Sequence, residues 1–156
     1  MKLNSRFPRE VASLLGGFDF LMCYQCGKCT SLCPVYLHNP SLFHPRKILE
    51  KILVGKRDIL QSSEIWMCTT CYECYENCPQ KVNLAEVFIA LRNLAVREGY
   101  VPKELAEEIK QIQQNGYLYP LGEQVKKVRS ELNLPPLTQD TSRVQAVLSA
   151  QEVRVK

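Results

Sequence analysis

All eight cysteines of this 156-residue chain fall in two blocks that repeat one spacing. Each block reads C-x2-C-x2-C-x3-C-P, the first from Cys23 to Pro34 and the second from Cys68 to Pro79. Cysteines at intervals of three let one loop bind three irons of a four-iron cubane, and the fourth iron then needs a thiolate from elsewhere. The doubled run therefore predicts two [4Fe-4S] clusters in one chain.

The fourth cysteine of each block is predicted to cross to the other cluster, as it does in ferredoxins that hold two clusters. Each cluster then takes three cysteines of one block and the last cysteine of the other block. Such crossing would link the two halves of the chain, so that cluster binding and folding depend on each other. The predicted ligands are Cys23, Cys26, Cys29 and Cys78 for cluster 1, and Cys68, Cys71, Cys74 and Cys33 for cluster 2.

Zinc sites and structural disulfides are the alternative uses of these cysteines. Zinc proteins usually present cysteines in separated pairs, and a third cysteine three residues after a pair has no place in a tetrahedral site. Disulfide frameworks are typical of short secreted chains, whereas the first residues here lack the apolar core of a secretory signal. His38 and His44 flank the first block, and histidine replaces cysteine at some iron–sulfur sites, but eight cysteines already complete both ligand sets.

Composition and charge limit the remaining function classes. The chain has 46% hydrophobic and 23% charged residues, which favours a folded globular protein, and no apolar stretch approaches the ~18 residues of a membrane span. The formal charge of +4 is offset by two clusters, because each cubane with four thiolates carries about −2. We therefore expect a cytoplasmic protein with no membrane span and no nucleic-acid partner.

Apolar residues at helical spacing predict an almost entirely helical chain. Asn83 and Glu86 form a capping-box pattern at the start of a helix that continues to Gly99. Further helices are expected over 8–15, 45–53, 58–61, 102–115 and 123–132, and their apolar stripes are expected to pack in the core.

The composition becomes polar beyond Pro135-Pro136. The expected organisation is a helical two-cluster domain over 1–134, with its cluster-binding core over 18–99, and a tail over 135–156 that either frays or orders on a partner. The helical faces after Pro102 and the tail are the candidate docking surfaces.

Four segments together resemble the C subunit of heterodisulfide reductase: CYQCGKCTSLCPV, FHPRKILEKI, IWMCTTCYECYENCP and NLAEVFIALRNLAVREG. The resemblance covers about Phe20 to Gly99. It implies an α-helical ferredoxin fold with flanking helices, similar to the cluster domain of succinate dehydrogenase's iron–sulfur subunit. It also implies an electron-transfer subunit without an active site of its own, in a hetero-oligomeric complex. The implied partners are the flavin-containing A subunit and the cysteine-rich catalytic B subunit, which in methanogens reduces the mixed disulfide of coenzyme M and coenzyme B.

The residues themselves agree with a relay, because there is neither a Gly-rich dinucleotide fingerprint nor a ninth cysteine. One alternative is the iron–sulfur subunit of a membrane-linked quinone oxidoreductase, a class that commonly carries a preceding two-iron domain with further cysteines. Another is a non-redox protein in which the metal only holds the fold together. Aligning the blocks sets Gly27-Lys28 against Tyr72-Glu73, so cluster 1 is expected to be the easier to reduce, because a nearby cation favours the added electron.

Overall fold

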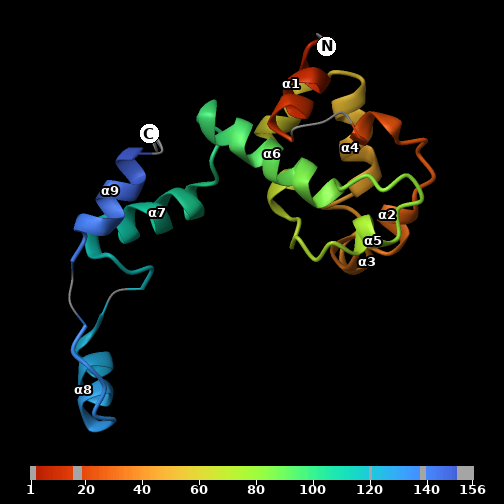
Figure 1. The fold of residues 1–156 in the computed structure, drawn as a ribbon. Helices are drawn as coiled ribbons and strands as arrows, with labels where there is room; N and C mark the ends of the chain where they lie inside the picture. Colours follow the sequence, from red (N-terminus) through yellow and green to blue (C-terminus); the bar gives the residue numbers. More distant parts are fainter. Residues whose placement is uncertain (1–2, 16–18, 120, 138–139, 151–156) are drawn as a thin grey trace. The chain divides into compact units, whose positions relative to one another are not determined.

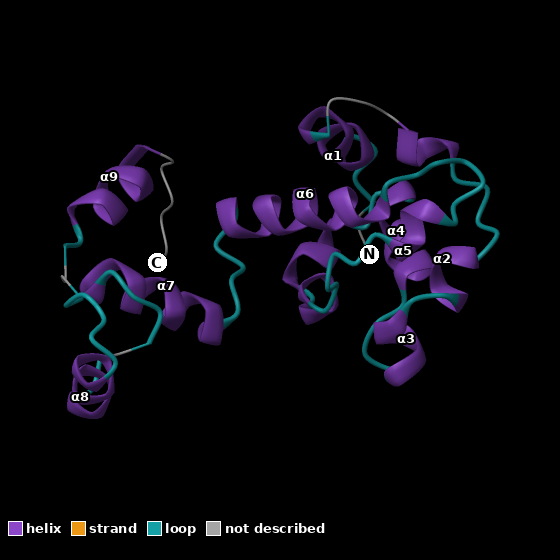
Figure 2. Cartoon of the chain, turned by 60° about the horizontal axis from the view of Figure 1, so that its bottom comes forward, coloured by secondary structure: helices purple, strands orange, loops and turns teal. Residues whose placement is uncertain are grey.

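The computed structural model describes residues 3–15, 19–119, 121–137 and 140–150. In these residues the regular secondary structure is helical throughout, with no strand (Figure 2), which confirms the prediction of a mainly α-helical protein. None of the described helices is both long and apolar enough to cross a membrane. Contacts divide the chain into two compact units, Met1–Tyr100 and Val101–Lys156, which are described one at a time.

The first unit contains both cysteine blocks (Figure 1). Its α-helices are α1 (Phe7–Leu14), α2 (Lys28–Ser31), α3 (Pro34–His38), α4 (Pro45–Leu53), α5 (Glu73–Glu76) and α6 (Leu84–Arg97). Its 3-10 helices are η1 (Asp19–Met22), η2 (Arg57–Gln61) and η3 (Ser63–Trp66). The helices predicted over 8–15 and 45–53 and after Asn83 are therefore confirmed as α1, α4 and α6, and the segment predicted over 58–61 is the 3-10 helix η2.

Helix α6 forms the centre of the core of the first unit, in contact with α1, α5, η2 and η3. It begins where predicted, because the Asn83 side chain accepts a hydrogen bond from the Glu86 backbone N–H at 3.3 Å. In a capping box the Glu86 carboxylate would bond to the Asn83 backbone N–H. Here it instead accepts a hydrogen bond from the Tyr72 hydroxyl at 2.8 Å. The buried residues of α6 are Leu84, Ala85, Val87, Phe88, Ala90, Leu91, Leu94 and Ala95.

Helix α4 is fixed at both ends. At its start, His44 Nδ1 accepts the Lys47 backbone N–H at 3.4 Å, and Pro45 occupies the first turn, where its missing N–H breaks no helical bond. Past its end, Gly55 has a φ of +79°, and a Cβ at this position would collide with the Asn4 backbone. The Asn4 N–H donates to the Gly55 carbonyl at 2.8 Å, so glycine lets the N-terminal segment lie against the end of α4.

The second unit contains α7 (Lys103–Asn115), α8 (Glu123–Glu131) and α9 (Ser142–Ala150) (Figure 1). Helices α7 and α8 were predicted from their apolar spacing, and Gly116 ends α7 with a φ of 75°. No residue of α7 or α8, both described in full, is buried, so the expectation that their stripes lie in the core is wrong. Apolar residues of α7 and α9 instead line a shared groove, made by Ile109, Ile112, Val144, Val147 and Leu148.

Contacts place the unit boundary after Tyr100, and the organisation expected from the sequence, a domain over 1–134 with a tail over 135–156, stays a prediction. Amphipathic spacing continues beyond residue 100, but helices α7 and α8 bury none of their residues. Of the predicted tail, residues 138–139 and 151–156 lie outside the described residues. The described part of the tail contains α9, which contacts α7.

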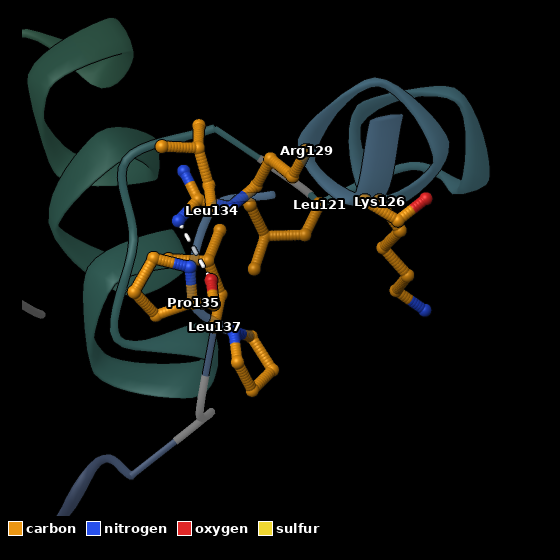
Figure 3. Close-up of a pocket in the computed structure, with 8 residues that line it drawn as sticks. Leu121, Lys126, Arg129, Leu134, Pro135 and Leu137 are labelled. Carbon is orange, nitrogen blue, oxygen red and sulfur yellow. Dashed lines mark hydrogen bonds between the residues drawn. The ribbon is translucent and has the colours of Figure 1, made fainter. Parts of the chain in front are cut away.

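A pocket of about 530 Å³ lies in the second unit beside α8 (Figure 3). Arg129 lines the pocket, and its Nη2 donates to the Pro135 carbonyl at 2.9 Å. Its walls are mainly apolar, with Leu121, Leu134, Pro135, Pro136 and Leu137 among the lining residues. The pocket contains no cysteine, and all eight cysteines lie in the first unit.

Candidate iron–sulfur centre

The two cysteine blocks fold into loops with the same backbone path. In the first loop Gln25 and Gly27 have φ angles of 62° and 83°, and at the equivalent places in the second loop Thr70 and Tyr72 have φ angles of 52° and 62°. Gly27 and Tyr72 each precede a four-residue helix, α2 or α5, that carries the third cysteine of its block. The sequence repeat is therefore a structural repeat.

A backbone N–H in each loop donates to the sulfur of the first cysteine. The Gln25 N–H donates to Cys23 Sγ and the Thr70 N–H donates to Cys68 Sγ, both at 3.4 Å. Such donors stabilise the thiolate, which is the form of cysteine that binds a metal. The left-handed conformation of a non-glycine residue costs about 1–2 kcal/mol, and three such residues, Gln25, Thr70 and Tyr72, occur in these two loops. Strain of this kind persists where surrounding contacts fix the backbone, and it is frequent at functional sites.

The first three thiols of each loop lie near the fourth cysteine of the other loop. Cys33 lines a small cavity together with the first three cysteines of the second loop, Cys68, Cys71 and Cys74. On the other side, burial raises the pKa of the Cys29 thiol, the Thr30 hydroxyl opposes the shift, and negative charge on Cys23, Cys26 and Cys78 adds to it. Both observations support the two ligand sets named from the sequence, and the sets themselves stay a prediction.

Two thiols of the second loop, Cys68 and Cys74, also have raised pKa values. Burial raises the pKa of Cys68, while the hydrogen bond from the Thr70 N–H and the positive charge of Arg92 partly oppose this shift. Burial is the main cause that raises the pKa of Cys74 to about 11. Negative charge on Cys68 adds to the shift, and so does negative charge on Cys29 and Cys71. The effect of Cys29 on Cys74 means that thiols of the two loops are neighbours, and α2 contacts α5. Because these thiols are protonated near neutral pH, metal binding must release their protons.

The eight cysteine thiols suit two four-iron cubane clusters better than single metal ions. In the described part of the chain, no three Cys, His, Asp or Glu side chains converge on a point where a single metal ion could bind. A cubane makes a different demand, because each of its four thiolates binds its own iron. Two sets of four thiols, with backbone N–H groups directed at sulfur, fit a pair of such clusters.

Arg92 of α6 supports the second loop and was not among the residues singled out from the sequence. Its Nε donates to the Ile65 carbonyl at 2.9 Å and its Nη2 to the Cys68 carbonyl at 2.6 Å, while the guanidinium lies 5.9 Å from the centre of the Trp66 ring. These bonds hold the chain that leads into the second loop and place a positive charge beside it. The sequence feature that could have pointed to Arg92 is its position, because a charged side chain there directly follows the apolar run 87–91 of a core helix.

Thr30 connects the first loop to the N-terminus of α4. Thr30 is 6% exposed, its Oγ1 accepts the Arg46 N–H at 3.0 Å, and it lies 4.0 Å from Cys29 Sγ. The Arg46 side chain packs beside Gly27. His44, which flanks the block, has a structural role, because it caps α4 and its ring packs edge-on against Tyr36 with centroids 4.9 Å apart. His38 is exposed at the end of α3.

Comparison with known proteins agrees with this geometry. Residues 19–82 match the family model of the 4Fe-4S dicluster domain. The chain is 36% identical to the C 2 iron–sulfur subunit of the CoB–CoM heterodisulfide reductase of Methanocaldococcus jannaschii over 126 residues, which cover 76% of this chain and 67% of that relative. It is 35% identical to the C iron–sulfur subunit of the CoB–CoM heterodisulfide reductase of Methanopyrus kandleri over 127 residues, which cover 76% of this chain and 65% of that relative.

A third relative is the C2 subunit of the H(2)/formate:CoB–CoM heterodisulfide,ferredoxin reductase of Methanococcus maripaludis, at 38% identity over 112 residues, 72% of this chain and 56% of that relative. The chain thus spans between about half and two thirds of the length of these relatives. The resemblance read from the sequence and the prediction of two [4Fe-4S] clusters are both confirmed. The chain belongs to the C-subunit family of heterodisulfide reductase iron–sulfur proteins, with an α-helical dicluster domain that binds two [4Fe-4S] clusters.

Proposed function

We propose that this chain relays single electrons between the flavin-containing A subunit and the catalytic, disulfide-reducing B subunit of a heterodisulfide reductase complex. The relatives described above are named as parts of reductases of the CoB–CoM heterodisulfide, and this disulfide is the proposed final acceptor. Bound four-iron clusters supply one-electron oxidation and reduction. The chain supplies the ligands, the separation from water and the surfaces at which partners dock.

The observation that carries the proposal is that each loop has one exposed cysteine. Cys26 and Cys71 are exposed, whereas the other cysteines are partly buried. A methionine directly precedes the first cysteine of each loop, and both are exposed, Met22 by 67% and Met67 by 38%. Methionine is frequent at protein-binding surfaces because its side chain adapts to different partners. Two equivalent exposed edges, one beside each cluster, are what a conductor with a partner at each end requires.

The inner side of the cluster region is apolar. Phe43 and Phe88, with ring centroids 5.3 Å apart, line the cavity that contains Cys33 and the first three cysteines of the second loop. Both rings are buried, so they keep water from the inner side of cluster 2. The sequence provides no thiol beyond the eight proposed ligands, and disulfide reduction is accordingly assigned to the catalytic B subunit.

The proposed ligand sets are crossed, as stated from the sequence. Cys23, Cys26 and Cys29 with Cys78 hold cluster 1, and the remaining four cysteines hold cluster 2. The grouping of Cys33 with the second loop supports this arrangement, as does the effect of Cys78 on the pKa of Cys29.

The second unit is the proposed docking region for the rest of the complex. Helices α7 and α8 bury none of their residues, and the groove between α7 and α9 is lined almost wholly by aliphatic side chains. Apolar surface gathered in this way is typical of a protein interface. This feature supports a hetero-oligomer, and the tail that was singled out from the sequence contributes α9 to it.

The test is electron delivery in the assembled complex. The flavin-containing subunit is reduced and mixed with the catalytic subunit, the full chain and the mixed disulfide of coenzyme M and coenzyme B, and both cluster bleaching and the release of the two thiols are followed. We expect thiol release with all three proteins, none without this chain, and none from this chain with its reductant alone. Turnover in the absence of this chain would overturn the relay.

Paired surface variants test the two ends. Met22→Arg and Met67→Arg each place a charge at one exposed edge, and each is expected to slow electron exchange with a different partner. Val54→Arg is the matched control, because Val54 is 46% exposed but follows the end of α4 that lies away from the Arg46–Thr30 contact. If both methionine variants affect the same partner, the two-ended arrangement is wrong.

A further inference from the structure

Hydrogen bonds to sulfur are unequally distributed between the two ligand sets. Among the described residues, the cluster 1 set receives the Gln25 N–H at 3.4 Å, the Gln25 side-chain amide at 3.7 Å and the Val82 N–H, which reaches Cys78 Sγ at 3.3 Å. The cluster 2 set receives the Thr70 N–H at 3.4 Å. The repeated backbone gives each set one N–H, and the additional donors belong to cluster 1.

The difference at the fourth cysteine arises from the chain that follows it. After Cys33 the chain enters helix α3, and the Leu37 N–H donates to the Cys33 carbonyl at 2.9 Å. After Cys78 the chain stays non-helical up to the start of α6, Lys81 has a φ of 53°, and the Val82 N–H donates to the Cys78 sulfur. Equivalent N–H groups thus donate to a carbonyl in one repeat and to a sulfur in the other.

Thr30 adds a side-chain donor to the cluster 1 set. A threonine hydroxyl has one proton and two lone pairs. The Arg46 N–H uses a lone pair of Thr30, which leaves the hydroxyl proton for the Cys29 sulfur at 4.0 Å. The neighbouring Ser31 hydroxyl donates to a backbone carbonyl at 3.0 Å instead. Tyr75 stands at the place of Thr30 in the second loop.

Hydrogen bonds to the sulfurs of a cluster raise its reduction potential, because they stabilise the negative charge that reduction adds. Positive charge lies beside both loops, with Arg46 next to Gly27 in the first and Arg92 bound to the Cys68 carbonyl in the second. The Glu73 carboxylate also lines the cavity of the cluster 2 set, and a nearby negative charge disfavours the added electron. The donors to sulfur and this carboxylate therefore act in the same direction, and variants of the donors isolate the contribution of the hydrogen bonds.

We propose that the additional donors make cluster 1 the higher-potential cluster, and that Thr30 is a positioning residue that raises its potential through the bond to Cys29. The proposal rests on the crossed ligand sets and deepens the relay function. Electrons would rest on the cluster 1 side of the relay at equilibrium, and the partner that docks beside Cys71 would exchange electrons with the lower-potential cluster.

The test is an EPR-monitored redox titration of the full chain with both clusters bound. Thr30→Val removes the hydroxyl and keeps the side-chain shape. We expect the electron affinity of the higher-potential cluster to fall about two- to tenfold, the usual contribution of one hydrogen bond, where tenfold corresponds to ~59 mV. The lower-potential signal is expected to stay in place. Thr30→Ser restores a hydroxyl and is expected to restore the potential.

Ser31→Ala is the matched control, because it removes the adjacent hydroxyl that does not reach sulfur, and neither potential should move. Gln25→Thr gives the first loop the residue that the second loop has at the same left-handed position, and it should also lower the higher potential. If Thr30→Val loses iron, the Gln25→Thr variant still tests whether donors to sulfur raise the potential of cluster 1. The proposal is overturned if these variants leave the higher-potential signal in place or shift the lower one instead. Partner subunits are absent from the titration, so failure of the relay assay and failure of this proposal are distinguishable.

Discussion

The two cysteine loops have the same backbone but are held by different parts of the fold. The first loop is tied to the start of α4 through Thr30 and Arg46. The second is tied to α6 through Arg92, which holds the Cys68 carbonyl, and through the bond from Tyr72 to Glu86. The cysteine spacing and the left-handed turns therefore define the cluster-binding geometry, whereas residues outside the repeat anchor each loop and define its electrostatic surroundings.

The equivalent positions Gly27 and Tyr72 show the same difference between shared backbone and separate anchoring. Gly27 and Tyr72 both have positive φ angles ahead of a short helix. Glycine adopts this conformation without strain, while a tyrosine there needs compensation. The hydroxyl bond from Tyr72 to Glu86, at 2.8 Å, fixes that tyrosine on the core helix. One repeat therefore uses a residue that needs no support, and the other uses a residue that also anchors the loop.

The largest expected difference between the loops concerns Arg92. Arg92→Gln removes a charged donor from two backbone carbonyls, and we expect the free energy of unfolding to fall by about 2–3 kcal/mol. Loss of iron should be faster from cluster 2 than from cluster 1, as measured by EPR during chelator challenge. Arg97→Gln, on the exposed end of the same helix, serves as the control. Equal loss from both clusters would mean that Arg92 is not specific to the second loop.

The next expected effect concerns the left-handed glycine of the first loop. Gly27→Ala adds a Cβ at a φ of 83°, and we expect it to lower the free energy of unfolding by about 1–2 kcal/mol. Denaturant unfolding of the cluster-bound chain measures the change. A stabilising Gly27→Ala change would contradict the assigned backbone.

A smaller effect is expected for the anchor of the second loop. Tyr72→Phe removes the hydroxyl that donates to Glu86, for an expected loss of about 0.5–1 kcal/mol. Because Tyr72 and Glu86 contact each other, Tyr72→Phe and Glu86→Gln should be non-additive in a double-mutant cycle. Additive losses would show that the bond contributes nothing to the anchoring of the loop.

The smallest effect is a pH dependence at the start of α4, which supports the first loop. Desolvation, followed by the charges of Lys47 and Arg46, lowers the pKa of His44 below 6.5. Its neutral Nδ1 accepts the Lys47 N–H, so protonation removes the cap. The stabilisation is therefore complete above pH 6.5 and decreases as the pH falls through the lowered pKa. His44→Asn keeps a cap that does not titrate, and should flatten the dependence of the unfolding midpoint between roughly pH 8 and pH 5.

The sequence predicted the parts of this molecule that depend on local pattern. Cysteine spacing was sufficient for the clusters, and Asn83 and Pro45 marked the starts of α6 and α4 because capping and proline chemistry act within one turn. The supports of the loops were not predictable in this way, since Arg46 meets Thr30 across 16 residues and Arg92 meets Cys68 across 24. The extent of the core was also missed, because apolar spacing in α7 and α8 does not reveal whether another layer covers it.

Reciprocal replacement of the fourth cysteines tests whether the fourth cysteine of each loop binds the cluster of the other loop. Cys26→Ser and Cys71→Ser first identify, by EPR, the signal that belongs to each loop. We expect Cys33→Ser to perturb the signal that Cys71→Ser perturbs, and Cys78→Ser to perturb the signal that Cys26→Ser perturbs. If Cys33→Ser instead perturbs the same signal as Cys26→Ser, the ligands are not crossed and the account of both clusters fails.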